Sequence, residues 1–128
     1  MNFLRLYYCS RSAKEALQSA EEAGWIKPEG LELIELPCSG RIEVAELLRA
    51  FTAGAEAVAV VGCLEGNCQF HSGNYESRKC VQRGKTILKK VGIDEALLEM
   101  FNVSSNQAWK IPEIIKELET RIRKEVED

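Results

Sequence analysis

The sequence lacks the features that several large classes of protein need. No apolar run approaches the roughly 20 residues of a membrane-spanning helix, so no membrane span is expected. The chain starts with Met1-Asn2-Phe3-Leu4-Arg5 and leads directly into a predicted strand, so we expect no secretory leader and a cytoplasmic location. The formal net charge of −3 comes from a mixed surface, which argues against a general nucleic-acid binder.

Common catalytic patterns are also missing. The single histidine, His71, leaves most nucleophile–base schemes with one possible base. No carboxylate pair is placed for acid–base catalysis, no Ser-His-Asp set is present, and no Gly-x-Gly-x-x-Gly fingerprint marks a dinucleotide site. These absences leave enzymatic activity undecided and favour a non-catalytic protein.

The chain does have enough apolar sequence for one core. Its 128 residues are 45% hydrophobic and 29% charged. A chain of this length buries roughly two-thirds of its unfolded surface without needing disulfide or metal staples. No linker, internal repeat or low-complexity segment divides it. We therefore predict a single domain over residues 1–128.

Strand-like and helix-like segments alternate along the chain. Runs of apolar, aromatic or β-branched residues predict strands at 3–9, 31–36, 57–62 and 97–103. Apolar residues at helical spacing and glycine stops predict helices over about 12–24, 42–54, 75–91 and from about 111 to the end of the chain. The continuous apolar run 57–62 predicts a strand buried on both faces. Asp94 is expected to cap a short turn before the fourth strand.

Helical crossovers between successive strands imply parallel pairing, with helices on both faces of the sheet. Right-handed crossovers then favour the strand order 2-1-3-4. The predicted fold class is therefore α/β, with a small four-stranded parallel sheet of flavodoxin-like architecture.

Five cysteines are present, an odd number in a chain expected in a reducing compartment, where persistent disulfides are uncommon. Cys9 closes the first predicted strand, Cys38 follows the second, Cys63 ends the third, and Cys68 lies five residues further on. Because parallel strands end at the same edge, these four cysteines are predicted at one end of the molecule. Cys80 falls inside the third predicted helix and is predicted to be core filler.

The surroundings of these cysteines suit an anionic sulfur site. Cys38-Ser-Gly-Arg41 and the loop of Cys63 and Cys68 both lead into predicted helices. Amide groups at helix N-termini and in glycine-containing loops direct partial positive charge at thiolates and lower their pKa. Gly66 allows the backbone to approach a bulky cofactor, and Arg41 is either a nearby positive charge or an ordinary surface residue.

Two cofactors fit this pattern. The Cys-x4-Cys spacing of Cys63 and Cys68 occurs in zinc sites and in plant-type two-iron ferredoxins. Because a chain this apolar does not need zinc to fold, we favour a 2Fe-2S cluster held by Cys9, Cys38, Cys63 and Cys68, with zinc as the alternative. His71 cannot supply a Rieske-type histidine pair and is predicted to lie near the site without binding the metal.

Two segments resemble a known family. Gly62-Cys-Leu-Glu-Gly-Asn-Cys68, followed by Gly73-Asn-Tyr75 and a basic helix, resembles the signature of the methyl-viologen-reducing hydrogenase delta-subunit family. Cys38-Ser-Gly-Arg41 resembles that family's second motif, and the resemblance covers nearly the whole chain.

The resemblance implies a small iron–sulfur protein carrying a 2Fe-2S cluster. Such a protein passes electrons from a hydrogenase or formate dehydrogenase to the flavoprotein subunit of heterodisulfide reductase in anaerobes. We expect assembly with a flavin- and iron–sulfur-containing subunit through the cysteine edge, with His71, Asn74 and Tyr75 at the interface.

The chain departs from the family pattern in three places. The family commonly has Cys-x-x-Cys at the end of the first strand, whereas here Leu6 precedes Cys9 in that spacing. Histidine usually follows each cysteine of the loop motif, where this chain has Leu64 and Gln69. Cys80 stands where the family tends to have a basic residue. Four cysteines still complete a ligand set, so the cluster remains the prediction.

Two other functions are compatible with parts of the pattern. The first is a zinc-bound protein-interaction module, because the cysteine spacing also suits zinc. The second is a phosphocysteine or thiol enzyme based on Cys9, since Cys9-Ser-Arg-Ser12 before a helix resembles the phosphocysteine loops of sugar-phosphotransferase B domains and small phosphatases. That loop has no glycine, Glu15 stands where those phosphatases have arginine, and the other cysteines would stay unexplained.

Overall fold

The computed structural model describes residues 3–9, 12–26, 30–36, 43–62, 73–103 and 106–127. The strands are β1 (Leu4–Cys9), β2 (Leu31–Leu36), β3 (Ala57–Gly62) and β4 (Leu98–Asn102). The helices are α1 (Ser12–Glu22), α2 (Val44–Thr52), α3 (Gly73–Lys90) and α4 (Lys110–Glu127), with a short 3-10 helix, η1 (Glu95–Leu97), before β4. Strand and helix alternate as the sequence predicts.

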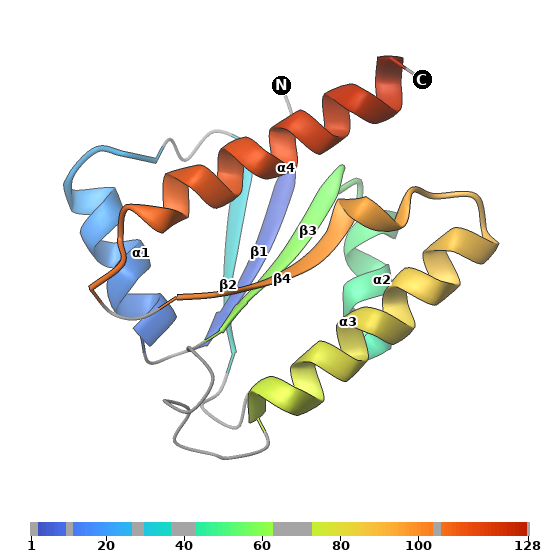
Figure 1. The fold of residues 1–128 in the computed structure, drawn as a ribbon, viewed down its shortest axis with the longest axis horizontal. Helices are drawn as coiled ribbons and strands as arrows, with labels where there is room; N and C mark the ends of the chain where they lie inside the picture. Colours follow the sequence, from blue (N-terminus) through green and yellow to red (C-terminus); the bar gives the residue numbers. More distant parts are fainter. Residues whose placement is uncertain are drawn as a thin grey trace.

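The four strands form one parallel sheet in the order β2-β1-β3-β4 (Figure 1). β1 lies between β2 and β3, and β4 extends the sheet beyond β3. The α/β class, the parallel pairing and the strand order are therefore confirmed.

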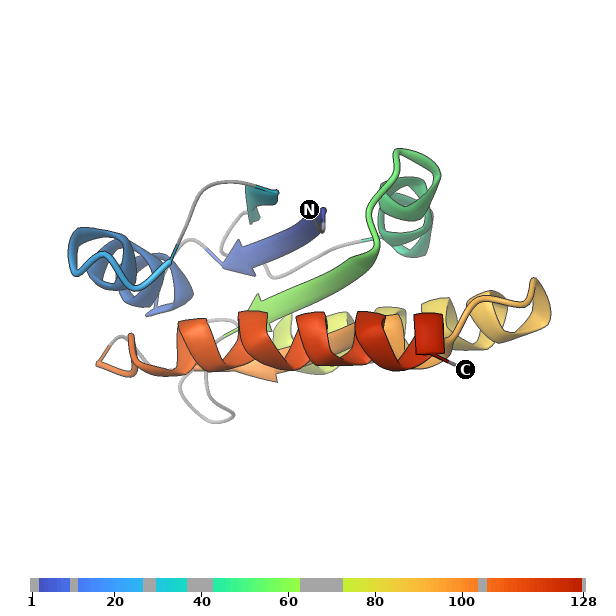
Figure 2. The ribbon, with the colours of Figure 1, turned by 90° about the horizontal axis from the view of Figure 1, so that it is seen from above.

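Helices cover both faces of the sheet. The side chains of a strand alternate between faces, and this alternation divides the core into two clusters. Leu4 and Leu6 of β1 pack in one cluster with residues of α1 and α4, whereas Tyr7 packs in the other with residues of α2 and α3. Figure 2 shows α1 and α2 on opposite sides of the strands, with α4 running along the sheet in front of them.

β3 lies at the centre of both clusters. All six of its residues are buried, as predicted for the run Ala57–Gly62. Ala57, Ala59 and Val61 face α1 and α4, and Val58 and Val60 face α2 and α3. A strand buried on both faces needs apolar residues at every position, which is why this strand was the clearest in the sequence.

The start of β4 differs from the prediction by one residue. The predicted strand begins at Leu97, but Leu97 belongs to η1 and is followed by β4 at Leu98. Asp94 caps η1 as expected, because its carboxylate accepts the Ala96 N–H at 2.9 Å. This local hydrogen bond keeps Leu97 out of the sheet ladder.

α3 approaches β4 closely at one glycine. A Cβ placed on Gly84 would lie 2.7 Å from Leu98 Cδ2, and Leu98 is fully buried. Because glycine has no side chain, the backbone of α3 can pack directly against the edge strand β4. Val81 and Leu88, one turn away on either side, are buried on the same face of α3.

Candidate functional site

The candidate site lies at the carboxyl edge of the sheet, where the strands end level. Cys9, the last residue of β1, is the register partner of Leu36, the last residue of β2. Tyr8 pairs with Val61, so β3 ends at Gly62 beside Cys9. Gly62 in turn pairs with Asn102, the last residue of β4.

One predicted ligand lies at this edge, and two others follow the strand ends closely in the chain. The backbone of Cys9 is at the edge, at the carboxyl end of β1. Cys38 follows Leu36 by two residues in the chain, and Cys63 follows Gly62 directly. The predicted site residues outside the described residues are Cys38, Arg41, Cys63, Gly66, Cys68 and His71. Their roles stay predictions.

Two predicted interface residues, Asn74 and Tyr75, lie in the first turn of α3. The helix begins at Gly73, two residues before the predicted start at Tyr75. The helix therefore starts soon after the segment that contains Cys63 and Cys68.

Among the described side chains, no group of three or more His, Cys, Asp or Glu residues is placed to hold a metal ion. The side chains of the four predicted ligands are not among the described ones, and the ligand set stays a prediction. Among the described helices, none is both long enough and apolar enough to cross a membrane.

Cys80 lies in α3, as predicted. It is half-buried and packs against the cluster that contains Tyr7, Val58 and Leu98. Because an α-helix rises about 1.5 Å per residue, Cys80 lies about 10 Å along the axis from the start of α3 at Gly73. Its position fits a small core residue on the α2–α3 face.

Arg78 and Asn102 form a contact at the edge that the sequence did not indicate. The Arg78 Nη2 atom donates to the Asn102 Oδ1 atom at 3.5 Å. Asn102 was predicted inside a strand that continues to Val103, but β4 ends at Asn102, level with Gly62. An arginine of α3 is thus held beside the carboxyl edge.

A hollow of about 350 Å³ lies next to this edge, between the end of β4 and the first turns of α4. It is lined by Phe101, Asn102, Lys110, Glu113, Ile114 and Glu117. Trp109, which precedes α4, is 51% exposed, and the Lys110 Nζ lies 5.7 Å from the centre of its ring.

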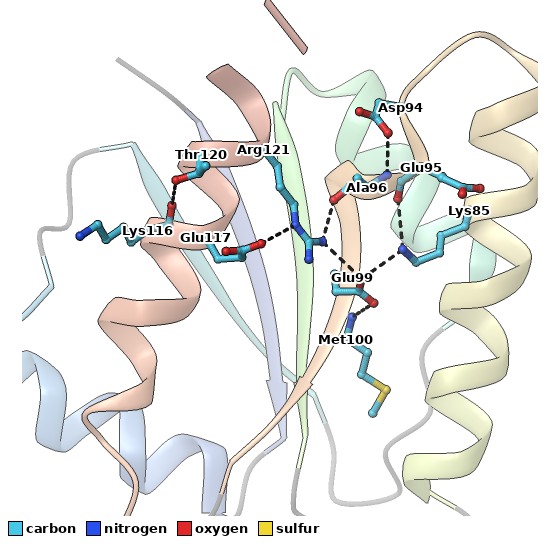
Figure 3. Close-up of polar contacts among 10 residues, drawn as sticks. All are labelled: Lys85, Asp94, Glu95, Ala96, Glu99, Met100, Lys116, Glu117, Thr120 and Arg121. Atoms are coloured by element: carbon cyan, nitrogen blue, oxygen red, sulfur yellow. Dashed lines mark hydrogen bonds and ion pairs between the residues drawn. The ribbon is translucent and has the colours of Figure 1, made fainter. Parts of the chain in front are cut away.

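A cluster of charged side chains surrounds Glu99 in the first half of β4 (Figure 3). Its Oε2 atom lies 3.2 Å from the Lys85 Nζ of α3 and 3.3 Å from the Arg121 Nη1 of α4. Its Oε1 atom accepts the Met100 N–H at 3.1 Å. One carboxylate thus joins α3, β4 and α4 at the outer strand of the sheet.

The partners of Glu99 hold its carboxyl group in the charged form. Burial alone would raise the pKa of Glu99. The Met100 N–H bond and the nearby Lys85 and Arg121 charges outweigh burial and keep the pKa below its ordinary value. Lys85 also donates to the Glu95 carbonyl at 3.3 Å, and Arg121 donates to the Ala96 carbonyl at 2.9 Å. The cluster therefore anchors η1 as well, which indicates a structural role.

Comparisons with known proteins cover most of the chain. A family model described as the delta subunit of methyl-viologen-reducing hydrogenase matches residues 5–124. The iron-sulfur subunit of the F420-non-reducing hydrogenase vhu from Methanococcus maripaludis is 39% identical over 97 residues, which cover 76% of this chain and 72% of that protein. The iron-sulfur subunit of the F420-non-reducing hydrogenase from Archaeoglobus profundus is 31% identical over 110 residues, or 84% of this chain and 80% of that protein.

A further relative is a much longer protein. A subunit of the ferredoxin:CoB-CoM heterodisulfide reductase from Methanosarcina mazei is 32% identical over 96 residues. These residues cover 72% of this chain but 12% of that relative, so the similarity is to one segment of a much longer protein. With the family model matched over residues 5–124, these findings show that the chain belongs to the methyl-viologen-reducing hydrogenase delta-subunit family.

Proposed function

We propose that this chain is an electron-transfer subunit of an oxidoreductase complex and carries a 2Fe-2S cluster held by Cys9, Cys38, Cys63 and Cys68. It relays electrons between a hydrogenase- or formate dehydrogenase-type donor and the flavoprotein subunit of a heterodisulfide reductase-type complex. The observation that carries the proposal is the common level at which β1, β2 and β3 end. From these ends the chain enters the segments that contain the other three cysteines.

The comparisons support the same role. The relatives from M. maripaludis and A. profundus are named iron-sulfur subunits of hydrogenases. The M. mazei relative belongs to a heterodisulfide reductase and contains a segment similar to this chain. Electron transfer requires a short distance between redox centres. If this chain must lie close to the reductase for that reason, a similar segment inside a reductase subunit is expected.

The donor set fits the proposed cofactor. Four cysteine thiolates are the usual ligands of a two-iron, two-sulfur cluster. When bound, the cluster supplies one-electron redox chemistry. The chain supplies the thiolates, and we expect backbone amides near Gly66 and the charge of Arg41 to offset their negative charge. No acid, base or substrate pocket is required of the protein.

The test is metal and sulfide analysis of the full chain prepared without oxygen. We expect iron and acid-labile sulfide in equal amounts, visible absorbance, and an EPR signal after reduction. Cys9→Ser should lose most of the iron and sulfide, because it removes one of four ligands. The matched control is Cys80→Ala, which removes a cysteine on α3 and should leave both unchanged.

Three outcomes would contradict the proposal in different ways. A colourless protein with stoichiometric zinc would favour the zinc-bound interaction module. Unchanged iron in Cys9→Ser would show that Cys9 is not a ligand. Loss of iron in Cys80→Ala would show that the ligand set is wrong.

A further inference from the structure

The charge of α3 differs sharply from that of the rest of the chain. Residues 78–90 contain six lysine or arginine residues and no aspartate or glutamate. This segment therefore carries a formal charge of +6, which against the total of −3 leaves −9 for all other residues. The only acidic residue of α3 is Glu76 in its first turn, whereas α4 mixes both signs along its length, as a helix charged only for solubility would.

Most of these cations point away from the core. Arg83, Lys89 and Lys90 are exposed, and none of them has an ion-pair partner among the described residues. At 100° per residue, Lys79, Arg83 and Lys90 lie on the side of α3 opposite to the buried Val81. Figure 1 shows α3 at the border of the fold, with its outer side uncovered by the other helices.

The arrangement is unfavourable for the isolated helix. Lys79 and Arg83 are four residues apart, as are Lys85 and Lys89, and like charges at this spacing repel each other. Lys85 is compensated by Glu99, but Glu99 lies on the β4 side of the helix. An acidic surface placed against the outer side of α3 would pair with Arg83 and Lys90, which have no ion-pair partner among the described residues.

Apolar side chains lie among these cations. Ile87 is 39% exposed on α3, and Val91, which directly follows the helix, is 65% exposed. A protein surface can bury such side chains, whereas a nucleic-acid backbone offers phosphates and no apolar contact.

We propose that the basic face of α3, formed by Lys79, Arg83, Ile87 and Lys90, docks onto an acidic surface of the redox partner. This inference rests on the proposed function for the identity of the partner, the flavoprotein of the heterodisulfide reductase-type complex. The contact of Arg78 with Asn102 places the first half of α3 at the carboxyl edge of the sheet, and that of Lys85 with Glu99 places the second half further along β4. A partner that covers the whole basic face would therefore reach the cysteine edge at the N-terminal end of α3.

The experiment compares two double variants of the full chain with equal charge change. Arg83→Glu with Lys90→Glu reverses two cations of the basic face, and Lys116→Glu with Arg123→Glu reverses two exposed cations of α4. The probe is the purified heterodisulfide reductase-type flavoprotein from the same organism, with binding measured between about 0.05 M and about 0.5 M salt. We expect the α3 variant to bind at least about tenfold more weakly at low salt, mainly through slower association, and the α4 variant to bind within about threefold of the wild type.

Several results would overturn the inference. These are absence of wild-type binding to the flavoprotein, full binding by the α3 variant, or equal weakening in both double variants. Tighter binding of the wild type to phosphatidylserine vesicles or to duplex DNA, lost in the α3 variant, would assign the face to a lipid or nucleic acid instead.

Iron and sulfide content, measured in every sample, separates this inference from the proposed function. A variant with a full cluster and weak binding supports docking through α3. Binding by a chain that never holds a cluster, with the same loss in the α3 variant, would contradict the relay function and leave the docking surface intact.

Discussion

The two longest helices, α3 and α4, are both 18 residues long and pack on opposite faces of the sheet beside β4. α4 buries Ile111, Ile114, Leu118 and Ile122 at helical spacing, and its exposed charges have both signs. Its Arg121 also pairs with Glu117 one turn earlier, at 3.1 Å.

The described part of α3 has a smaller apolar face and a basic outer face. It buries Val81 and Leu88, and Gly84 lets it approach Leu98. The comparison teaches that α4 is stabilised by its own core face and surface ion pairs, whereas Arg83, Lys89 and Lys90 of α3 are exposed cations without an ion-pair partner among the described residues. Three substitutions test this difference.

The largest effect is expected in the core face of α4. Leu118→Ala removes a fully buried side chain from the cluster shared with β1 and β3. Because the surrounding core relaxes only partly, the free energy of unfolding should fall by about 3 kcal/mol. Denaturant unfolding measures this free energy. The control is Ile115→Ala, which removes a half-buried side chain and should lower the free energy of unfolding clearly less. An equal loss of unfolding free energy in both variants would mean that the buried side chains of α4 do not dominate its stability.

An intermediate effect is expected at Glu99, which joins both helices to β4. Glu99→Gln keeps the shape of the side chain and removes the charge that lies between Lys85 and Arg121. Since the carboxylate is partly exposed, the loss should be about 1 kcal/mol at neutral pH. Denaturant unfolding at neutral pH provides the measurement.

The pH dependence of the Glu99 effect has a definite sign. The folded state lowers the pKa of Glu99, so its contribution is present above the unfolded pKa and disappears as the pH falls through the folded pKa. The stability difference between wild type and Glu99→Gln should therefore be largest near neutral pH and shrink in acid below the ordinary range of a glutamate. A difference that grows in acid would contradict the assigned charge state.

The smallest effect is expected on the outer side of α3. Arg83→Glu places a carboxylate four residues from Lys79 and removes a like-charge pair. The free energy of unfolding should change by less than about 0.5 kcal/mol, in the stabilising direction. Thermal unfolding at low salt measures it, with Lys116→Glu on α4 as the equal charge change. A clear loss of stability would show that Arg83 supports the fold, and would argue against a free docking face.

Much of the fold could be predicted because it depends on local patterns. The bounds of β2 and β3 agree with the sequence prediction, since their apolar runs end at proline or glycine-rich sequence. The start of β4 was wrong by one residue because the Asp94 cap takes Leu97 into η1. For the site, the sequence predicted the level strand ends and the place of Cys9, whereas the roles of Cys38, Cys63 and Cys68 remain predictions.

The sequence by itself determined the alternation of strands and helices, the parallel sheet, and the placement of Cys9 at its carboxyl edge. These features follow from periodicity and from the handedness of crossovers, which act within one element or between neighbours. Only the tertiary structure decided which residues of distant elements meet, such as Glu99 with Lys85 and Arg121, or Arg78 with Asn102. Such pairs depend on how helices settle against the sheet, a geometry that the packing of the whole core sets and that no local pattern contains.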